Sequence, residues 1–207
     1  MKVVIISSTA NKKLAPFIEE QMNSLRSIGI TCVLFQVTQN GIIGYLKHYK
    51  LLKRMIRLEK PDLIHAHYGF SGLLANLQRK IPVITTFHGT DINNKKIRWI
   101  SFIVARLSEK SIYVTEQLKT LSRNDYGVVI PCGVDLSVFT PQEMTLAKRK
   151  MKLDSTKNYV LFCSKFDNSI KNSPLAIRAF NELKKRQSIN MELLELKKEK
   201  MINGNIN

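Results

Sequence analysis

The chain has 207 residues, of which 44% are hydrophobic and 24% charged, a composition that indicates a folded globular protein and excludes disordered and fibrous classes. Thirty-three Lys and Arg residues against 16 Asp and Glu residues give a formal net charge of +17. Such a charge favours anionic partners such as phosphates, acidic lipid surfaces or nucleic acid.

The predicted elements alternate between strands and helices. Val3–Ile6 is a β-branched run, typical of a strand buried on both faces of a parallel sheet. Pro16 opens a helix to about Ile28, and Gly29 stands where a C-terminal cap is expected. Further strands are predicted at residues 32–37, 63–65, 83–87, 111–114 and 128–130, and further helices at about 42–59, 69–78, 97–107 and 116–122. This alternation predicts a doubly wound parallel α/β sheet, whose ligands bind beyond the carboxyl ends of the strands.

A domain boundary is predicted after Pro141. Residues 1–141 form the first domain, and residues 142–157 form a linker that contains a charged helix. Residues 158–207 begin a second domain, with a strand at 159–163 and a helix at 174–186. Residues 191–196 fit a strand or a helix, and the polar tail 197–207 is expected to be frayed.

The cysteines and the apolar runs bear on location. Three cysteines make no disulfide framework; Cys32 and Cys163 lie in apolar runs and are expected in the core, while the role of Cys132 is open. No apolar run is long enough for a signal peptide or a membrane span. We therefore expect a cytoplasmic protein.

Two strand-end segments carry candidate chemistry. His65 and His67 are two residues apart on one strand, so both side chains leave the same face. Zinc binding would need a third ligand, which the neighbouring sequence does not supply, and packing of the strand end is the alternative role. His88, Gly89 and Asp91 follow the next strand, in a loop that can bind a sugar hydroxyl or a phosphate, or act only as a capped turn.

A third segment, residues 130–135 with 139–141, is rich in turn formers and can serve as a domain linker. Taken in order, the segments DLIHAHYG, TFHGTD and IPCGVDLSVFTP closely resemble glycosyltransferase family 4, whose members have two Rossmann-like domains in the arrangement called GT-B. The match covers about Met1 to Arg186. The resemblance implies a retaining transfer of a sugar from a nucleotide-diphosphate sugar to a glycan or lipid-linked acceptor, with no further cofactor.

The resemblance also implies roles for individual residues. His88 resembles the family's histidine that reaches the donor sugar, and Asp91 and Gly89 complete that loop, with His88 and Asp91 as the catalytic candidates. His67 and Tyr68 are expected to line the acceptor side. In the second domain, Lys165 and Lys171 resemble the cations that bind the donor diphosphate, although Lys165 stands where the family usually has Arg.

Two features depart from the family pattern. The loop Ser7–Lys13 contains none of the family's usual glycines, which also excludes a dinucleotide-dependent oxidoreductase. The family's two glutamates, separated by seven residues in the donor domain, have no counterpart, so the chain alone is expected to be inactive. Truncation, a frameshift or a split gene would explain this. A non-catalytic acceptor- or membrane-binding remnant, or half of an enzyme with a separate donor domain, is the alternative.

The predicted helix 42–59 has a basic face. Leu46, Tyr49, Leu52 and Ile56 can face the core. The cations recur every three or four residues, at Lys47, Lys50, Lys53 or Arg54, Arg57 and Lys60. An anionic membrane surface fits this face, as does a solvated exterior. Nucleic acid is discounted, because no recognisable binding motif or aromatic stacking platform is present.

Overall fold

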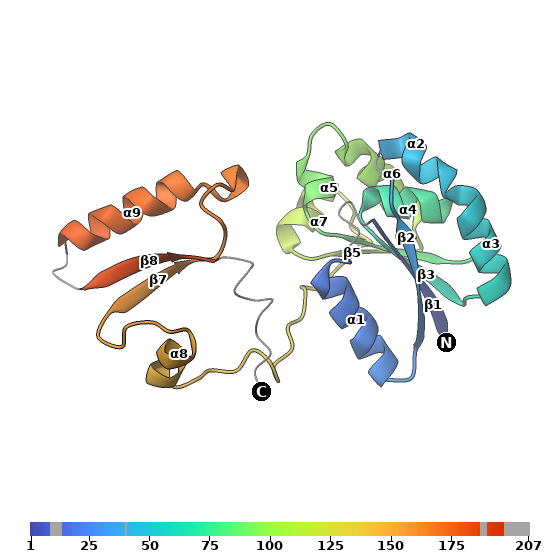
Figure 1. The fold of residues 1–207 in the computed structure, drawn as a ribbon. Coiled ribbons are helices and arrows are strands. Elements are labelled where there is room, and N and C mark those ends of the chain that lie inside the picture. Colours follow the sequence, from blue (N-terminus) through green and yellow to red (C-terminus); the bar gives the residue numbers. More distant parts are fainter. Residues whose placement is uncertain (9–13, 40, 187–189, 197–207) are drawn as a thin grey trace. The chain divides into compact units, whose positions relative to one another are not determined.

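The structure, a computed structural model, describes residues 1–8, 14–39, 41–186 and 190–196. It divides into two units, Met1–Phe139 and Thr140–Asn207, so the division falls two residues before the predicted end of the first domain. Each unit is described by itself (Figure 1). The tail 197–207, predicted to be frayed, and most of the Ser7–Lys13 loop lie outside the described residues.

The first unit is built on six strands. They are β1 (Lys2–Ser8), β2 (Thr31–Val37), β3 (Leu63–His67), β4 (Val83–Phe87), β5 (Lys110–Tyr113) and β6 (Val128–Val129). Their order across the sheet is β2-β1-β3-β4-β5-β6, and every neighbouring pair is parallel. The chain order reverses between β1 and β3, which is where ligands commonly bind in such sheets. The predicted doubly wound α/β fold is confirmed.

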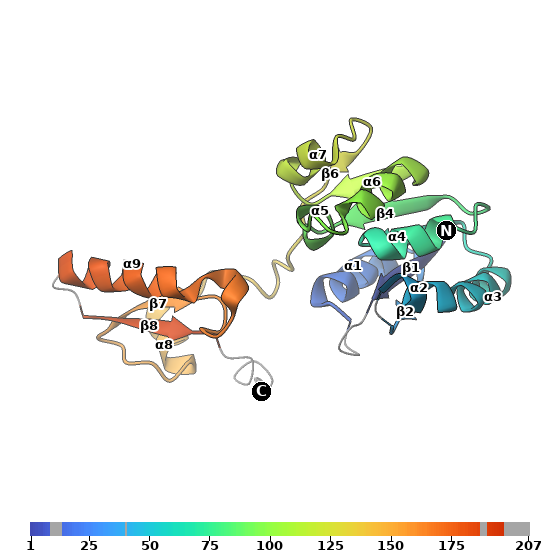
Figure 2. The ribbon, with the colours of Figure 1, turned by 90° about the horizontal axis from the view of Figure 1, so that it is seen from above.

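Helices cover both faces of this sheet. They are α1 (Pro16–Ser27), α2 (Gly41–Lys47), α3 (Tyr49–Glu59), α4 (Gly69–Asn76), α5 (Thr90–Asn93), α6 (Arg98–Leu107) and α7 (Glu116–Ser122). Alternate residues of β1 face opposite ways, so Val3 and Ile5 pack under α1 while Val4 and Ile6 pack with α2, α3 and α4. Of the helices described in the first unit, only α1 packs on the face of the sheet that carries Val3 and Ile5 (Figure 1). Figure 2 shows α3, α2, α4 and α6 side by side across the other.

The predicted helix 42–59 is in fact two helices, α2 and α3, which separate at His48. The His48 ring donates from Nδ1 to the carbonyl of Gly44 at 2.8 Å, and its backbone N–H bonds the carbonyl of Tyr45. A side chain that bonds the backbone in this way competes with the helical ladder. Leu46, predicted to face the core, is 49% exposed, because the three-residue spacing that relates it to Tyr49 in one continuous helix does not apply across the break.

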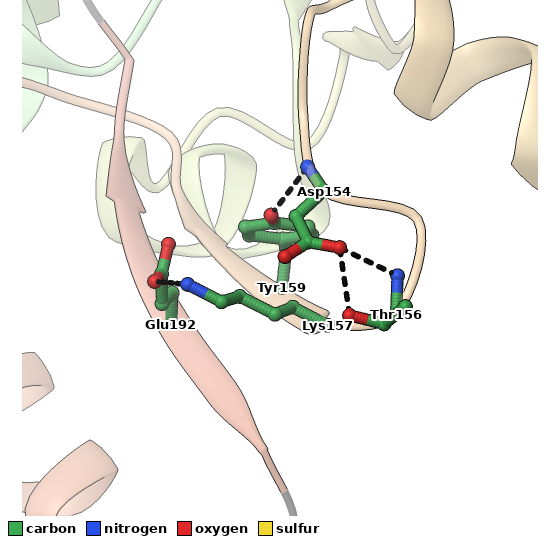
Figure 3. A network of polar contacts seen from close by, with 5 residues as sticks. All are labelled: Asp154, Thr156, Lys157, Tyr159 and Glu192. Carbon is green, nitrogen blue, oxygen red and sulfur yellow. Dashed lines mark hydrogen bonds and ion pairs between the residues drawn. The ribbon is translucent and has the colours of Figure 1, made fainter.

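The second unit contains α8 (Met144–Lys150), β7 (Asn158–Phe162), the short 3-10 helix η1 (Ser169–Lys171), α9 (Ser173–Arg186) and β8 (Met191–Glu195). Residues 191–195 are therefore a strand, parallel to β7. A polar network holds the start of this pair (Figure 3). Lys157 pairs with Glu192 at 2.5 Å across the two strands, and the Asp154 carboxylate accepts two bonds from Thr156. This network fixes the turn that leads into β7.

One of the two predictions of a buried cysteine is confirmed. Cys32 is buried beside α1, as predicted, whereas Cys163 is exposed and the prediction of a core position was wrong. Cys163 directly follows β7, which belongs to a sheet of only two strands within the described residues. So small a sheet covers few side chains, and Val160 and Leu161 of the same strand are also exposed. An apolar run predicts a strand here but does not predict how much packs on it.

Candidate active site

A cleft of about 730 Å³ opens at the carboxyl edge of the six-stranded sheet, on the face that carries α1. One wall is α1, with Phe17, Gln21 and Ser24. The floor is formed by the ends of β3, β4 and β5, which contribute His67, Thr86 and Ile112, and by His88 after β4. The exposed segment 130–136 after β6 forms the far wall. The cleft therefore lies where parallel α/β sheets place their ligands.

Three histidine rings are stacked at this edge. The ring centroids of His65 and His67 are 4.6 Å apart, and those of His67 and His88 are 5.2 Å apart. Strands β3 and β4 are adjacent and parallel, and His67 is paired with Thr86. His88 follows Thr86 by two residues, so it lies beside His67. His67 Nδ1 and His88 Nε2 are 3.0 Å apart, and His65 Nε2 lies 2.8 Å from the Thr86 hydroxyl. Neighbouring strands thus join the two histidine motifs.

Burial keeps all three rings neutral at ordinary pH. Desolvation lowers the pKa of His65 to about 4, with a further contribution from the charge of His88. It lowers the pKa of His67 to about 2, helped by both neighbouring histidines, and that of His88 to about 4. The bond between His67 and His88 therefore joins two neutral rings, in which one nitrogen donates and the other accepts.

Two aromatic side chains enclose His88 within this cluster. Phe17 lies with its ring centroid 4.6 Å from that of His88, and Tyr68 lies 4.7 Å away. Tyr68 has a φ of +71°, a conformation that a residue with a side chain adopts only under constraint, and it immediately precedes α4. Burial, followed by the negative charge of Asp91, raises the pKa of the Tyr68 hydroxyl, so this group is a neutral hydrogen-bond donor. The His88 ring therefore packs against two aromatic rings and also has the Tyr68 hydroxyl as part of its surroundings.

The loop after β4 is shaped by Gly89 and Asp91. Gly89 has a φ of +113°, which residues with side chains rarely adopt, and its N–H donates to Asp91 Oδ1 at 2.9 Å. Asp91 is buried in the short helix α5, and its Oδ2 has no protein partner among the described residues. Burial raises the pKa of this carboxyl, and nearby backbone N–H groups oppose the shift.

Asp91 and His88 border different hollows. Asp91 lines a smaller one of about 330 Å³, together with Tyr45, Tyr68 and Phe70. Gly69, beside Tyr68, is the first residue of α4. A Cβ atom there would meet the Ser101 hydroxyl of α6, so the glycine permits helix packing. Of the two catalytic candidates, His88 therefore lines the large cleft, and Asp91 lines the smaller hollow.

The sequence did not single out Phe17, Thr86 or Cys132 as site residues. Phe17 is marked only by its place in the first helical turn after β1, and Thr86 by the register of β3 and β4. Residues 130–136, which a linker role would also explain, line the cleft. Within the described residues, no group of three or more His, Cys, Asp or Glu side chains is arranged to hold a metal ion. No described helix is long and apolar enough to cross a membrane.

The two predicted phosphate-binding lysines lie in the second unit. Lys165 is exposed in the loop after β7, and Lys171 is exposed at the end of η1, just before α9. The loop between them is braced, since Glu195 of β8 accepts the Phe166 N–H at 2.6 Å and Asn168 bonds Ser164 at 3.1 Å. Both lysines thus precede a helix N-terminus, where backbone N–H groups attract anions.

The sequence profile of Glycosyltransferase Family 4 matches residues 2–138 of this chain. The chain belongs to glycosyltransferase family 4. This family 4 chain is 34% identical, over 109 residues, to an uncharacterized glycosyltransferase of Methanocaldococcus jannaschii, an alignment that covers 47% of this chain and 31% of that protein. It is 28% identical, over 110 residues, to the UDP-Gal:alpha-D-GlcNAc-diphosphoundecaprenol alpha-1,3-galactosyltransferase of Escherichia coli, covering 45% and 27%. The matches span less than a third of these relatives' length.

Solved structures share the fold. Sucrose-phosphate synthase from Thermosynechococcus elongatus has a TM-score of 0.68 and 12% identity, covering 97% of this family 4 chain and 72% of that one. A glycosyltransferase from Rickettsia africae has a TM-score of 0.62 and 15% identity, covering 95% and 68%. Identities this low establish the architecture only. They confirm the Rossmann-like α/β fold that the resemblance implied.

Proposed function

We propose that this chain provides the acceptor-side domain of a retaining glycosyltransferase. The transferred sugar comes from a nucleotide-diphosphate sugar and goes to a glycan or lipid-linked acceptor. One observation carries the proposal: the hydrogen-bonded pair His67 and His88 lies at the floor of the large cleft, at the carboxyl edge of a family 4 sheet. A neutral imidazole can donate to or accept from a sugar hydroxyl without a charge change.

The roles of the two units follow from their groups. His88 contacts the donor sugar, Gly89 and Asp91 hold its loop, and His67 and Tyr68 border the acceptor. The leaving nucleoside diphosphate gains negative charge as the glycosidic bond breaks, and Lys165 and Lys171 stabilise that charge beside the N-terminus of α9. Solved structures of the same fold include the UDP-GlcNAc 2-epimerase of Methanocaldococcus jannaschii in complex with UDP-GlcNAc and UDP, with a TM-score of 0.52, which supports a nucleotide-sugar donor.

The acceptor side also suggests a location. The Escherichia coli relative is named for a diphosphoundecaprenol-linked acceptor, and the outer face of α3 is basic. We propose that the protein is peripheral at the inner face of the membrane, with an anionic membrane surface as a partner. The competing function is a non-catalytic binding module, or half of an enzyme whose donor domain is a separate chain.

Titration calorimetry with UDP, GDP and ADP tests the donor side. Binding by the full chain is expected to be lost in the double variant Lys165→Ala/Lys171→Ala. It is expected to persist in Lys184→Ala/Arg186→Ala, which removes the same two charges from the far end of α9. Equal loss in both variants, or no binding to any nucleotide, would refute the diphosphate site.

Transfer is tested separately, by incubating the full chain with sugar nucleotides and with acceptor sugars. The anomeric configuration of any product, determined by NMR, decides between retention and inversion. The chain alone is expected to be inactive, so the reaction is also run with a separate donor domain added, and His88→Ala is expected to abolish any transfer that is then observed while nucleotide binding persists. Nucleotide binding with no transfer to any acceptor would instead favour the non-catalytic module.

A further inference from the structure

Helix α6 is apolar on its inner and its outer face. Ile100, Val104 and Ala105 point inward and are buried in the core under α6. On the opposite side, Trp99 is 54% exposed and Ile103 is 43% exposed, and the two lie one helical turn apart. A helix that is apolar all round is normally covered on all sides. The outer face of α6 is therefore a candidate interaction surface.

The charged residues of this helix and of the residues just before it are all cations. Lys95 and Lys96 precede α6, and Arg98 begins it. Arg106 lies in its last turn, three residues after Ile103, so it continues the row of Trp99 and Ile103. From Lys95 to Leu107 the sequence contains no acidic residue. An apolar strip that carries cations at both ends of its own segment fits an occupant that is both anionic and apolar.

Helix α3 extends the same surface. It lies on the same face of the sheet as α6, with α2 and α4 between them (Figure 2). Its buried side is Leu52, and its outer side carries exposed cations together with exposed Leu51 and Leu58. The exposed cations of α3 are Lys50, Lys53, Arg54 and Arg57. Two helices on one face of the sheet thus combine exposed leucine, isoleucine and tryptophan with positive charge.

We propose that the outer faces of α6 and α3 form a docking surface for an anionic lipid bilayer, with Trp99 and Ile103 inserted at the level of the headgroups. This inference deepens the membrane partner proposed above by assigning the residues that reach the lipid. Tryptophan favours the interface because its ring is apolar while its N–H can remain hydrated, and cations beside it bind acidic headgroups.

A bilayer explains the combination better than a protein partner does. A protein interface that buries Trp99 would have to supply acidic groups for four cations within one segment. A bilayer containing acidic lipids supplies both mobile negative charge and an apolar phase, and the ring needs to enter only a short distance. Self-association through α6 would bring like charges together, which is unfavourable.

Trp99 is the only tryptophan in the chain, so its fluorescence reports on this surface directly. The full chain is mixed with vesicles of phosphatidylcholine and phosphatidylglycerol, and separately with vesicles of phosphatidylcholine alone. We expect the emission to shift to shorter wavelength only with the anionic vesicles, and lipids brominated on their acyl chains to quench it. Binding without a shift and without quenching would overturn the insertion of Trp99.

Matched variants locate the surface in vesicle sedimentation. Ile103→Ser is expected to weaken binding about tenfold, because a partly buried isoleucine is lost from the lipid phase. Ile28→Ser is the control, since Ile28 is 72% exposed at the end of α1 on the other face of the sheet. Lys95→Gln/Lys96→Gln is expected to weaken vesicle binding about fivefold per charge. The matched control is Lys184→Gln/Arg186→Gln in a helix of the second unit, which is expected to weaken it less.

The outcomes separate this inference from the glycosyl transfer. Vesicle binding needs no sugar, so an inactive protein that binds anionic vesicles through Ile103 still supports the docking surface. Equal weakening by Ile103→Ser and Ile28→Ser, or equal binding to neutral and anionic vesicles, would refute it. A dimer in sedimentation velocity that Ile103→Ser dissociates would assign the face to a second copy instead.

Discussion

The stacked histidines predict that the first unit loses stability as the pH falls below neutrality. The folded-state pKa values of His65 and His67, about 4 and about 2, lie below the ordinary value of 6.5. The unfolded chain therefore binds protons that the folded chain excludes. Stability is fully present above about pH 6.5 and is lost as the pH falls toward the folded pKa values.

The magnitude follows from linkage. Between about pH 7.5 and pH 5.5, each histidine held neutral contributes a loss of about 1.4 kcal/mol in the free energy of unfolding. His65, His67 and His88, whose pKa burial also lowers to about 4, together give a loss of about 4 kcal/mol, a large part of the stability of an ordinary domain. Asp91 acts in the opposite direction at lower pH, because burial raises its pKa.

Urea unfolding followed by Trp99 fluorescence measures this loss, since the only tryptophan lies in the unit that holds the histidines. His67→Gln removes one titrating ring and is expected to reduce the loss by about 1.4 kcal/mol over the same pH range. A free energy of unfolding that stays constant from neutral to mildly acid pH would refute the reasoning. So would a pH dependence that His67→Gln leaves unchanged.

Three further substitutions test the site and the core by urea unfolding. Asp91→Ala leaves the Gly89 N–H without its buried acceptor and is expected to cost about 1–3 kcal/mol, while Asp91→Asn keeps an oxygen and costs less. Gly89→Ala places a side chain at φ +113° and is expected to cost at least about 1 kcal/mol; a neutral result would mean that the loop relaxes freely. Leu52→Ala removes a fully buried side chain from the inner face of α3 and is expected to cost about 2–5 kcal/mol, against less than about 0.5 for exposed Leu51→Ala.

The sheet could be predicted because its strands are marked by local chemistry. Val83–Phe87 follows Pro82 and matches the predicted strand at both ends, and Gly29 adopts the positive φ expected of a residue that follows a helix. The two histidine motifs could also be assigned to one edge of the sheet. Their direct bond depends on the neighbouring register of β3 and β4, which the sequence does not state.

Other features depend on contacts that no local pattern carries. The break at His48 arises from one side-chain bond to Gly44, in a segment whose periodicity continues through it. The sequence predicts residues 90–93 only as part of a binding loop or capped turn, because the four residues that form the short helix α5 carry no periodicity. Cys163 shows the same limit for burial, because an apolar strand is covered only if other elements reach it.

The segment that joins the two units has a consequence for proteolysis. Residues 130–146 are exposed without interruption, yet no Lys or Arg occurs between Arg123 and Lys148 in a chain otherwise rich in both. Trypsin therefore has no cleavage site in this exposed stretch. Chymotrypsin has Phe139 and Leu136 there, so a brief digestion with it is expected to release two fragments near the division between the units, whereas trypsin leaves the joint intact.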